Sequence, residues 1–171
     1  MLKSRKIRDV MIGILELPHM PYWFNIKQSI TLLVEMSANS KMLPPQVLLV
    51  FDELYNLVGI VGVKEILRGL EPGDLTTDKQ ITEQDQSLPP LPWDTMFDLN
   101  KDDEQAHKPV SDIMLPVRYF VDADEPLSKA AYLMAHNNLD VLPVIENKKK
   151  LIGIVRIAEV FDVLSNAVLK E

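Results

Sequence analysis

The sequence predicts an α+β fold in which two β-α-β-β-α repeats pack pseudo-symmetrically into one module. Three observations lead to this prediction. Residues 57–70 (LVGIVGVKEILRGL) return as residues 151–164 (LIGIVRIAEVFDVL), with six of fourteen positions identical. Both halves open alike, with IRDVM at 7–11 and VSDIM at 110–114. The stretch between them, 71–109, differs in composition from both, so a duplicated unit with a connector is indicated.

The composition is that of a core-forming protein. Of 171 residues, 47% are hydrophobic and none is cysteine, which excludes a disulfide framework and thiolate metal sites and fits a reducing compartment. The apolar run VMIGIL at 10–15 is too short for a secretion signal or a membrane span. We therefore expect a cytoplasmic protein that does not insert into membranes.

The negative charge is concentrated in one segment. The chain has a formal net charge of −7, and residues 71–107 hold ten acidic residues against two lysines. The remainder has no excess of basic residues, and such an excess is what drives binding to a phosphate backbone. We therefore do not expect nucleic acid as a partner.

The first half is expected to contain the five elements in order. YWF (22–24) is predicted as a short strand, and a helix follows it. VLLVF (47–51) and LVGIV (57–61) are β-branched runs joined by DELYN, and this pattern is typical of a hairpin. A closing helix completes the unit. The apolar residues at helical spacing in the two helices are Ile26, Ile30, Leu33 and Val34, and then Val63, Ile66, Leu67 and Leu70.

The second half repeats this order. YFV (119–121) is predicted as a strand, and DADEP supplies helix-start residues with Pro126 in the first turn. VLPVI (141–145) and LIGIV (151–155) are predicted to pair across the turn ENKKK. The apolar stripes expected on the two helices are Leu127, Ala130, Ala131, Met134 and Ala135, and then Ile157, Ala158, Val160, Phe161, Leu164 and Val168.

These elements divide the chain into repeat 1 (7–70), an acidic, proline-containing connector (71–109) and repeat 2 (110–168). A three-stranded sheet covered by helices on one face leaves its other face open, so we expect the two sheets to pack against each other. Trp93 and Phe97 are costly to leave in water, so part of the connector is expected to dock onto a repeat. Whether it only buries itself locally or forms a lid over a ligand cleft stays open.

The duplicated unit resembles the cystathionine-β-synthase (CBS) domain. The resemblance is carried by VSDIM, by the run YFVDADEPLSKAAYLMAHNNLDVLPVIENKKKLIGIV and by AEV, in the order and spacing of that family. In the first half Leu49 stands where Pro143 supplies the usual proline. The resemblance implies a tandem pair that acts as a regulatory module, commonly as a homodimer, with an effector protein that the sequence does not identify.

The resemblance also implies a ligand site. Members that bind adenosine nucleotides carry, after the third strand, Gly, two apolar residues, Ser or Thr, two further residues and Asp, where the hydroxyl meets phosphate and the carboxylate meets the ribose. Here both copies depart from that pattern, with Gly62 and Arg156 at the hydroxyl position and glutamate at the carboxylate position. The ligand-contacting residues so implied are Gly62, Glu65, Met114, Pro143, Arg156 and Glu159.

Each of these residues has a second interpretation. Glu65 and Glu159 can accept bonds from a diol, or can serve only as carboxylates at a helix start. Arg156 can grip a phosphate, or can pair with Glu159 three residues later. If the two clefts differ, Gly62 against Arg156 is where the difference is expected to begin.

No catalytic constellation is present, so an enzyme is not expected. The three histidines, His19, His107 and His136, share no metal-ligand spacing, and no metal site is predicted. We therefore expect a stand-alone module that senses AMP, ADP, ATP or S-adenosylmethionine in the cleft between the repeats and relays this to a partner. The competing hypothesis is a protein-protein interaction or dimerisation module that has lost nucleotide binding.

Overall fold

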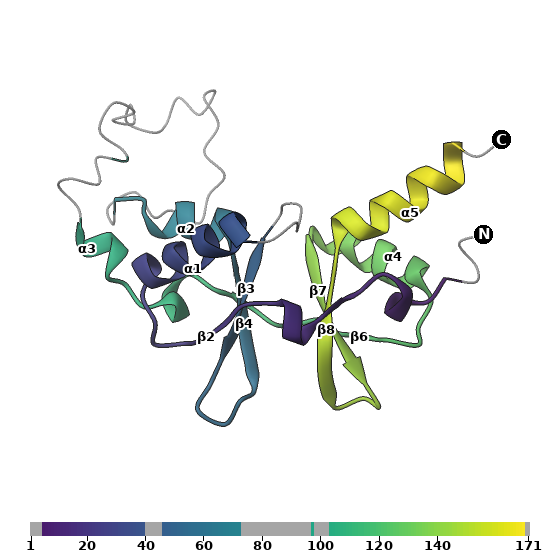
Figure 1. The fold of residues 1–171 in the computed structure, drawn as a ribbon, viewed down its shortest axis with the longest axis horizontal. Helices are drawn as coiled ribbons and strands as arrows, with labels where there is room; N and C mark the ends of the chain where they lie inside the picture. The colour runs from purple at the N-terminus through teal and green to yellow at the C-terminus, as the bar shows by residue number, and fades with distance from the viewer. Residues whose placement is uncertain (1–4, 40–45, 73–96, 98–102, 170–171) are drawn as a thin grey trace.

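The computed structural model describes residues 5–39, 46–72, 97 and 103–169, and its fold consists of two repeats side by side (Figure 1). The helices lie at one end of the molecule and both long hairpins point toward the other. Trp93 lies outside the described residues, whereas Phe97 is described and is 47% exposed.

The elements follow the predicted order, with one further short strand at the front of each repeat. In the first repeat they are β1 (Ile12–Gly13), β2 (His19–Pro21), α1 (Ile26–Asn39), β3 (Val47–Phe51), β4 (Leu57–Gly62) and α2 (Val63–Gly69). After α3 (Asp103–Ala106), the second repeat has β5 (Leu115–Pro116), β6 (Val121–Asp122), α4 (Leu127–Asn137), β7 (Val141–Glu146), β8 (Lys150–Arg156) and α5 (Ile157–Leu169). Single 3-10 turns lie at Ile7–Asp9, Ile14–Glu16 and Val110–Asp112.

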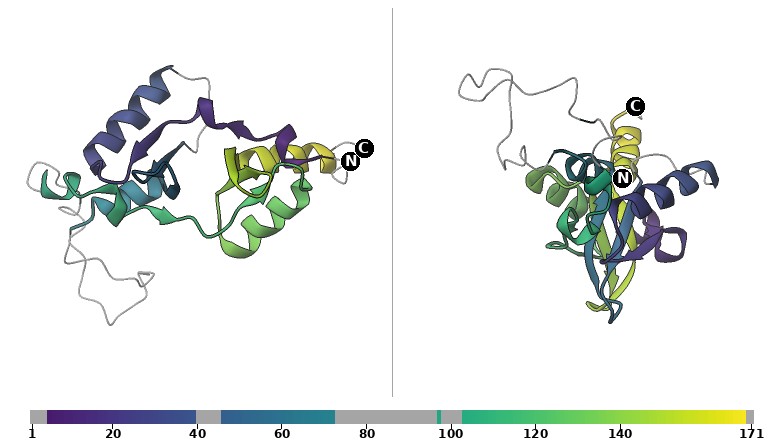
Figure 2. Two further views of the ribbon diagram at one scale, coloured as in Figure 1. Left: turned by 90° about the horizontal axis from the view of Figure 1, so that it is seen from below. Right: turned by 90° about the vertical axis from the view of Figure 1, so that its left-hand side faces the viewer.

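The two repeats exchange their opening segments. One sheet has the order β2-β3-β4-β5 and the other β1-β8-β7-β6. Each sheet therefore takes one edge strand, β5 or β1, from the other repeat. The exchange extends to the core, where Ile7 is fully buried among second-repeat residues and Val110 among first-repeat residues. The two crossing segments are visible in Figure 2 as the N-terminal strand and the strand after the connector.

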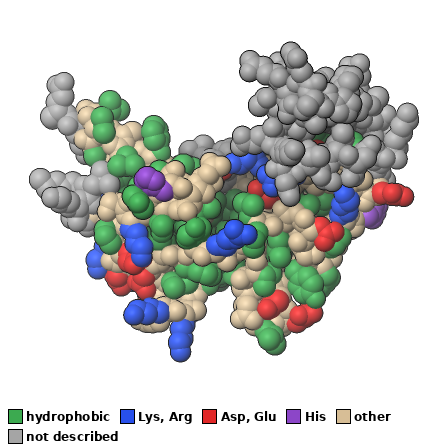
Figure 3. Space-filling view, turned by 180° about the vertical axis from the view of Figure 1, so that it is seen from behind, with side chains coloured by type: hydrophobic (Ala, Val, Ile, Leu, Met, Phe, Trp, Pro, Cys, Tyr) green, Lys and Arg blue, Asp and Glu red, His purple; other side chains and the backbone are tan. Residues whose placement is uncertain are grey.

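A third cluster of buried residues lies between the sheets. Val47, Leu49 and Phe51 alternate along β3 with Leu48 and Val50, which face the helices. The first set meets Ile60 of β4 and Ile154 of β8. Both faces of β3 are therefore covered, which explains its unbroken apolar sequence. From behind, hydrophobic side chains are also seen along the junction of the two repeats (Figure 3).

The predicted strand at 22–24 is wrong. The strand is His19–Pro21, because a reciprocal cap at Asn25 fixes the start of α1 at Ile26. Asn25 Oδ1 accepts the Gln28 N–H at 2.8 Å and Gln28 Oε1 accepts the Asn25 N–H at 2.9 Å. Residues 22–24 must therefore turn into the helix. The strand predicted at 119–121 is likewise displaced, to Val121–Asp122, with Tyr119 and Phe120 exposed ahead of it.

Parts of the predicted helix stripes are exposed. Only a narrow strip of each helix packs against its sheet. The buried residues of these strips include Ile66, Met134 and Val160, whereas apolar residues beside them on the same helices are exposed. Pro126 precedes α4 as its N-cap instead of lying in its first turn. The predicted inner-face residues that are exposed are Val34, Val63, Leu67, Ala135, Ile157, Phe161 and Val168.

Candidate functional site

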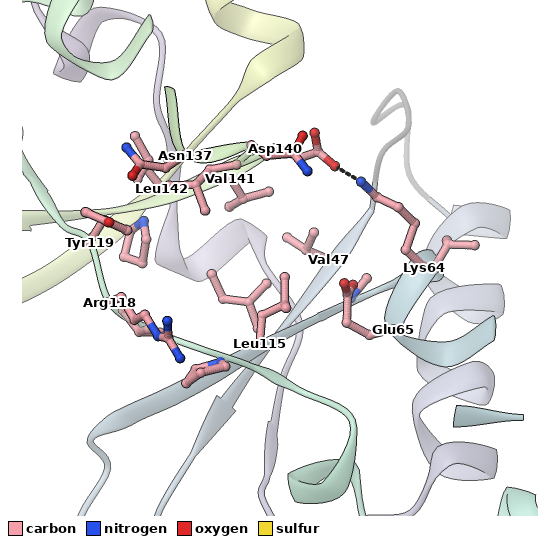
Figure 4. A pocket seen from close by; sticks show the side chains of 18 of the residues that line it. Val47, Lys64, Glu65, Leu115, Arg118, Tyr119, Asn137, Asp140, Val141 and Leu142 are labelled. Carbon is pink, nitrogen blue, oxygen red and sulfur yellow. Dashed lines mark hydrogen bonds and ion pairs between the residues drawn. The ribbon is translucent and has the colours of Figure 1, made fainter. Parts of the chain in front are cut away.

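A pocket of about 520 Å³ lies between the two repeats (Figure 4). Its lining comes from the start of β3, the junction of β4 with α2, residues 115–119, and the stretch from the end of α4 into β7. Its volume falls within the range usual for small-molecule sites. Because both repeats contribute walls, anything bound there touches both.

Glu65 is the most deeply buried acidic side chain of the pocket. It is 6% exposed, and its Oε2 accepts the Gly62 N–H at 2.8 Å at the start of α2. A Cβ at residue 62 would lie 2.9 Å from that oxygen, so glycine permits the close approach. Within the described chain Oε1 has no partner, and the carboxylate faces the pocket (Figure 4). One carboxylate oxygen is therefore available to a hydrogen-bond donor in the pocket.

Arg118 lines the pocket on the side opposite Glu65, together with Tyr119 (Figure 4). It lies on the segment between β5 and β6 and is exposed. In the described part of the chain its guanidinium has no hydrogen bond or ion pair. A free guanidinium is suited to phosphate or carboxylate groups, which it binds through two parallel N–H donors.

Lys64 and Asp140 close one rim of the pocket. Lys64 Nζ lies 2.5 Å from Asp140 Oδ2, which joins α2 of the first repeat to the residue before β7 of the second. The hydrogen bond to Asp140 raises the pKa of Lys64. The floor between these polar groups is apolar, with Val47, Leu115 and Val141 as its main side chains.

Three of the six predicted ligand residues line this pocket: Gly62, Glu65 and Pro143. Met114 lies nearby but packs inward, where its Sδ would be 2.4 Å from a Cβ placed on Gly59. Lys64, Arg118, Tyr119 and Asp140 were missed. The last three lie outside the repeated motif, and Lys64 lies within it at a position where the second copy has Ala158. Aligning the two openings would have singled out Arg118, since Leu15 occupies the equivalent position in the first repeat.

Arg156 and Glu159 do not line the pocket and contact each other instead. Arg156 is 4% exposed, and its Nε donates to Glu159 Oε1 and Oε2 at 3.1 and 3.0 Å. Its Nη2 also pairs with Oε1. The Arg156 backbone N–H donates to Oε2 at 3.1 Å, in the same way as Gly62 to Glu65. Both oxygens of Glu159 are therefore engaged within the chain.

The described residues hold no group of three or more His, Cys, Asp or Glu side chains that is placed to bind a metal ion. None of the described helices is both long enough and apolar enough to span a membrane.

Residues 110–166 match the model of the CBS domain family. CBSX2 of Arabidopsis thaliana, solved in complex with AMP, aligns with a TM-score of 0.63 at 21% identity over 96% of this chain and 99% of its own. The CBS domain pair of MJ0100, in complex with 5′-methylthioadenosine and S-adenosyl-L-methionine, aligns with a TM-score of 0.61 at 16% identity over 95% and 98%.

The cytosolic domain of the Mg²⁺ channel MgtE, in complex with ATP, aligns with a TM-score of 0.56 at 19% identity over 90% of this chain and 46% of that one. No curated protein sequence matches the chain.

Proposed function

We propose that this chain, a tandem CBS-domain module by its fold and by the family match over residues 110–166, is a regulatory module that binds an adenosine-containing nucleotide between its repeats. The carboxylate of Glu65 carries this proposal. It is 6% exposed, faces the pocket and keeps one oxygen without a partner among the described residues. A carboxylate oxygen that faces a pocket without a partner can accept a hydrogen bond from a ligand hydroxyl or N–H group.

The pocket offers one group for each part of a nucleotide. Ribose hydroxyls would donate to Glu65, and the phosphate would pair with Arg118 on the opposite wall. The base would cover Val47 and Leu115 on the apolar floor. The ligands bound by CBSX2, MJ0100 and MgtE all contain adenosine, which supports this class of ligand.

Ligand binding would act through the relation between the repeats. Glu65 belongs to the first repeat and Arg118 to the second, so a ligand held by both favours one orientation of the two. The module would relay that preference to a partner protein without itself catalysing a reaction. The absence of cysteine fits action in the cytoplasm.

Calorimetry with AMP, ADP, ATP and S-adenosylmethionine tests the proposal, with Glu65→Gln as the diagnostic variant. We expect at least one of these ligands to bind and Glu65→Gln to weaken it at least about tenfold, because bonds to a charged acceptor are stronger than neutral ones. Glu53→Gln, an exposed carboxylate on the β3–β4 hairpin, is the matched control and should bind normally. No binding of any of the four at millimolar concentration would exclude this function.

A dimerisation role has its own supporting observation. Val63 and Leu67 on α2 are 54% and 50% exposed, and the equivalent Ile157 and Phe161 on α5 are 41% and 68% exposed. Each helix thus presents an apolar pair one turn apart, and such repeated patches suit a self-complementary contact with a second copy. Sedimentation of Leu67→Lys/Phe161→Lys tests this: a dimer that becomes monomeric supports it, and an unchanged mass excludes it.

A further inference from the structure

The pocket has an equivalent position elsewhere in the fold, because the two repeats share one arrangement of strands. Strand pairing defines the equivalence, because Ile60 of β4 lies opposite Leu115 of β5, and Ile154 of β8 lies opposite Ile12 of β1. Counting from these pairs, Gly62 and Glu65 correspond to Arg156 and Glu159, and Arg118 corresponds to Leu15.

The two positions place their arginine differently. In the pocket, Arg118 stands across from Glu65 and has no partner within the described residues. At the equivalent position the guanidinium comes from the helix start itself, where Arg156 is 4% exposed and is bonded through Nε to both oxygens of Glu159. The charge that a ligand would meet in one position is already neutralised in the other.

The second position also lacks a cation for an anionic group. Leu15 stands where Arg118 stands in the pocket, and its side chain is 98% exposed. A nucleotide there would have no cation at this place for its phosphate. It would also have to displace Arg156 from Glu159, with loss of a bidentate ion pair.

We infer that each chain binds one nucleotide, in the pocket of Glu65 and Arg118. At the equivalent position, the ion pair of Arg156 with Glu159 takes the place of a ligand and prevents nucleotide binding. This deepens the proposed function and depends on it. The ligand class that follows has a ribose diol for Glu65 and one compact anionic group for Arg118. AMP is such a ligand and is therefore the probe.

Titration calorimetry of the full chain with AMP tests the inference through two matched variants. We expect one AMP per wild-type chain, an affinity at least about tenfold lower in Glu65→Gln, and an affinity within about twofold of wild type in Glu159→Gln. Thermal unfolding without ligand checks that both variants are folded. Two AMP per wild-type chain, or an equal loss of affinity in Glu159→Gln, would overturn the inference while leaving the proposed function standing.

A variant designed to gain a second AMP site completes the test. Leu15→Arg/Arg156→Gly gives the second position the arrangement of the first, and we expect it to bind a second AMP. Adding Glu65→Gln to this variant should leave only the new event. A folded Leu15→Arg/Arg156→Gly chain that still binds one AMP overturns the role of Arg156. If wild type and this variant both fail to bind, the proposed function and this inference fall together.

Discussion

Lys64 Nζ lies 2.5 Å from Asp140 Oδ2, and this ion pair spans the junction between the repeats at the rim of the pocket. The Lys64 side chain is 69% exposed and that of Asp140 40%, so water and salt screen the attraction. The pair is therefore expected to contribute little to stability.

Asp140→Asn is expected to lower the free energy of unfolding by only about 0.2–1 kcal/mol, as is usual for exposed pairs. Asp140 raises the pKa of Lys64 above its ordinary value of 10.5. Its stabilising contribution is therefore full below that value and is lost as pH rises through the raised pKa. Urea unfolding of both proteins at low and high salt measures the effect, which should shrink with salt. A loss that does not change with salt would contradict an electrostatic origin.

Asp124 holds the N-terminal segment to the second repeat. Its hydrogen bonds to Arg8 and Lys6 lower its pKa from 3.8 to about 2. The lowered pKa means that the contribution is present above pH 4 and is lost as pH falls toward 2. Near this residue the Ile7 N–H donates to Glu125 O at 3.0 Å.

We expect hydrogen exchange of the Ile7 and Arg8 amides to speed up between pH 4 and 2, relative to the intrinsic rates. Asp124→Asn should show the faster exchange already at pH 7. Asp162→Asn, an exposed carboxylate on α5, is the control and should exchange like wild type. Equal protection in Asp124→Asn would show that the backbone bonds alone hold the segment.

The two glycines of the repeated GIV motif predict unequal effects of alanine. A Cβ on Gly153 would lie 2.1 Å from the carbonyl oxygen of Ile12, in the backbone of β1, whereas one on Gly59 would meet the side chain of Met114. Backbone cannot move aside as a flexible methionine can. Gly153→Ala should therefore lose roughly 1–3 kcal/mol of stability and Gly59→Ala less, as measured by urea unfolding. Equal losses would mean that β1 is not held where the structure has it.

Ile7 should contribute more to the stability of the second repeat than to that of the first repeat, to which it belongs in sequence. It is fully buried in the second-repeat core, so Ile7→Ala is expected to cost about 2–5 kcal/mol of unfolding free energy. Leu15→Ala, at a side chain that is 98% exposed, should change stability by less than about 0.5 kcal/mol. Exchange protection in β7 and β8 reports whether the loss falls on the second repeat. Loss confined to α1 would contradict the exchange of segments.

Sequence reasoning succeeded where patterns are long. The repeated motif and both hairpins follow from periodicity and turn residues. It failed at 22–24, where the strand preference of three aromatic residues was outweighed by the Asn25–Gln28 cap. The exchange of β1 and β5 between the two sheets could not be predicted, because strands of two residues show no detectable periodicity.

The site was predictable only in part, for a similar reason. Gly62 and Glu65 lie within the repeated motif, so the resemblance pointed to them, and the structure places both at the pocket. Arg118 lies in a loop with no pattern of its own. Arg156 could contact a phosphate or form an ion pair with Glu159, and the sequence does not determine the side-chain conformation that decides between them. In the structure Arg156 is paired with Glu159.

The crossing of the two opening segments also bears on what holds the molecule in one piece. The Val110 N–H donates to Phe24 O at 2.7 Å and the Arg8 N–H to Ala123 O at 2.9 Å, so the opening segment of each half of the chain is bonded to the other half. We therefore expect the two halves to stay associated without peptide-bond continuity through residues 73–96. A protein cut there by a protease, or expressed as two separate polypeptides, should behave as one noncovalent particle.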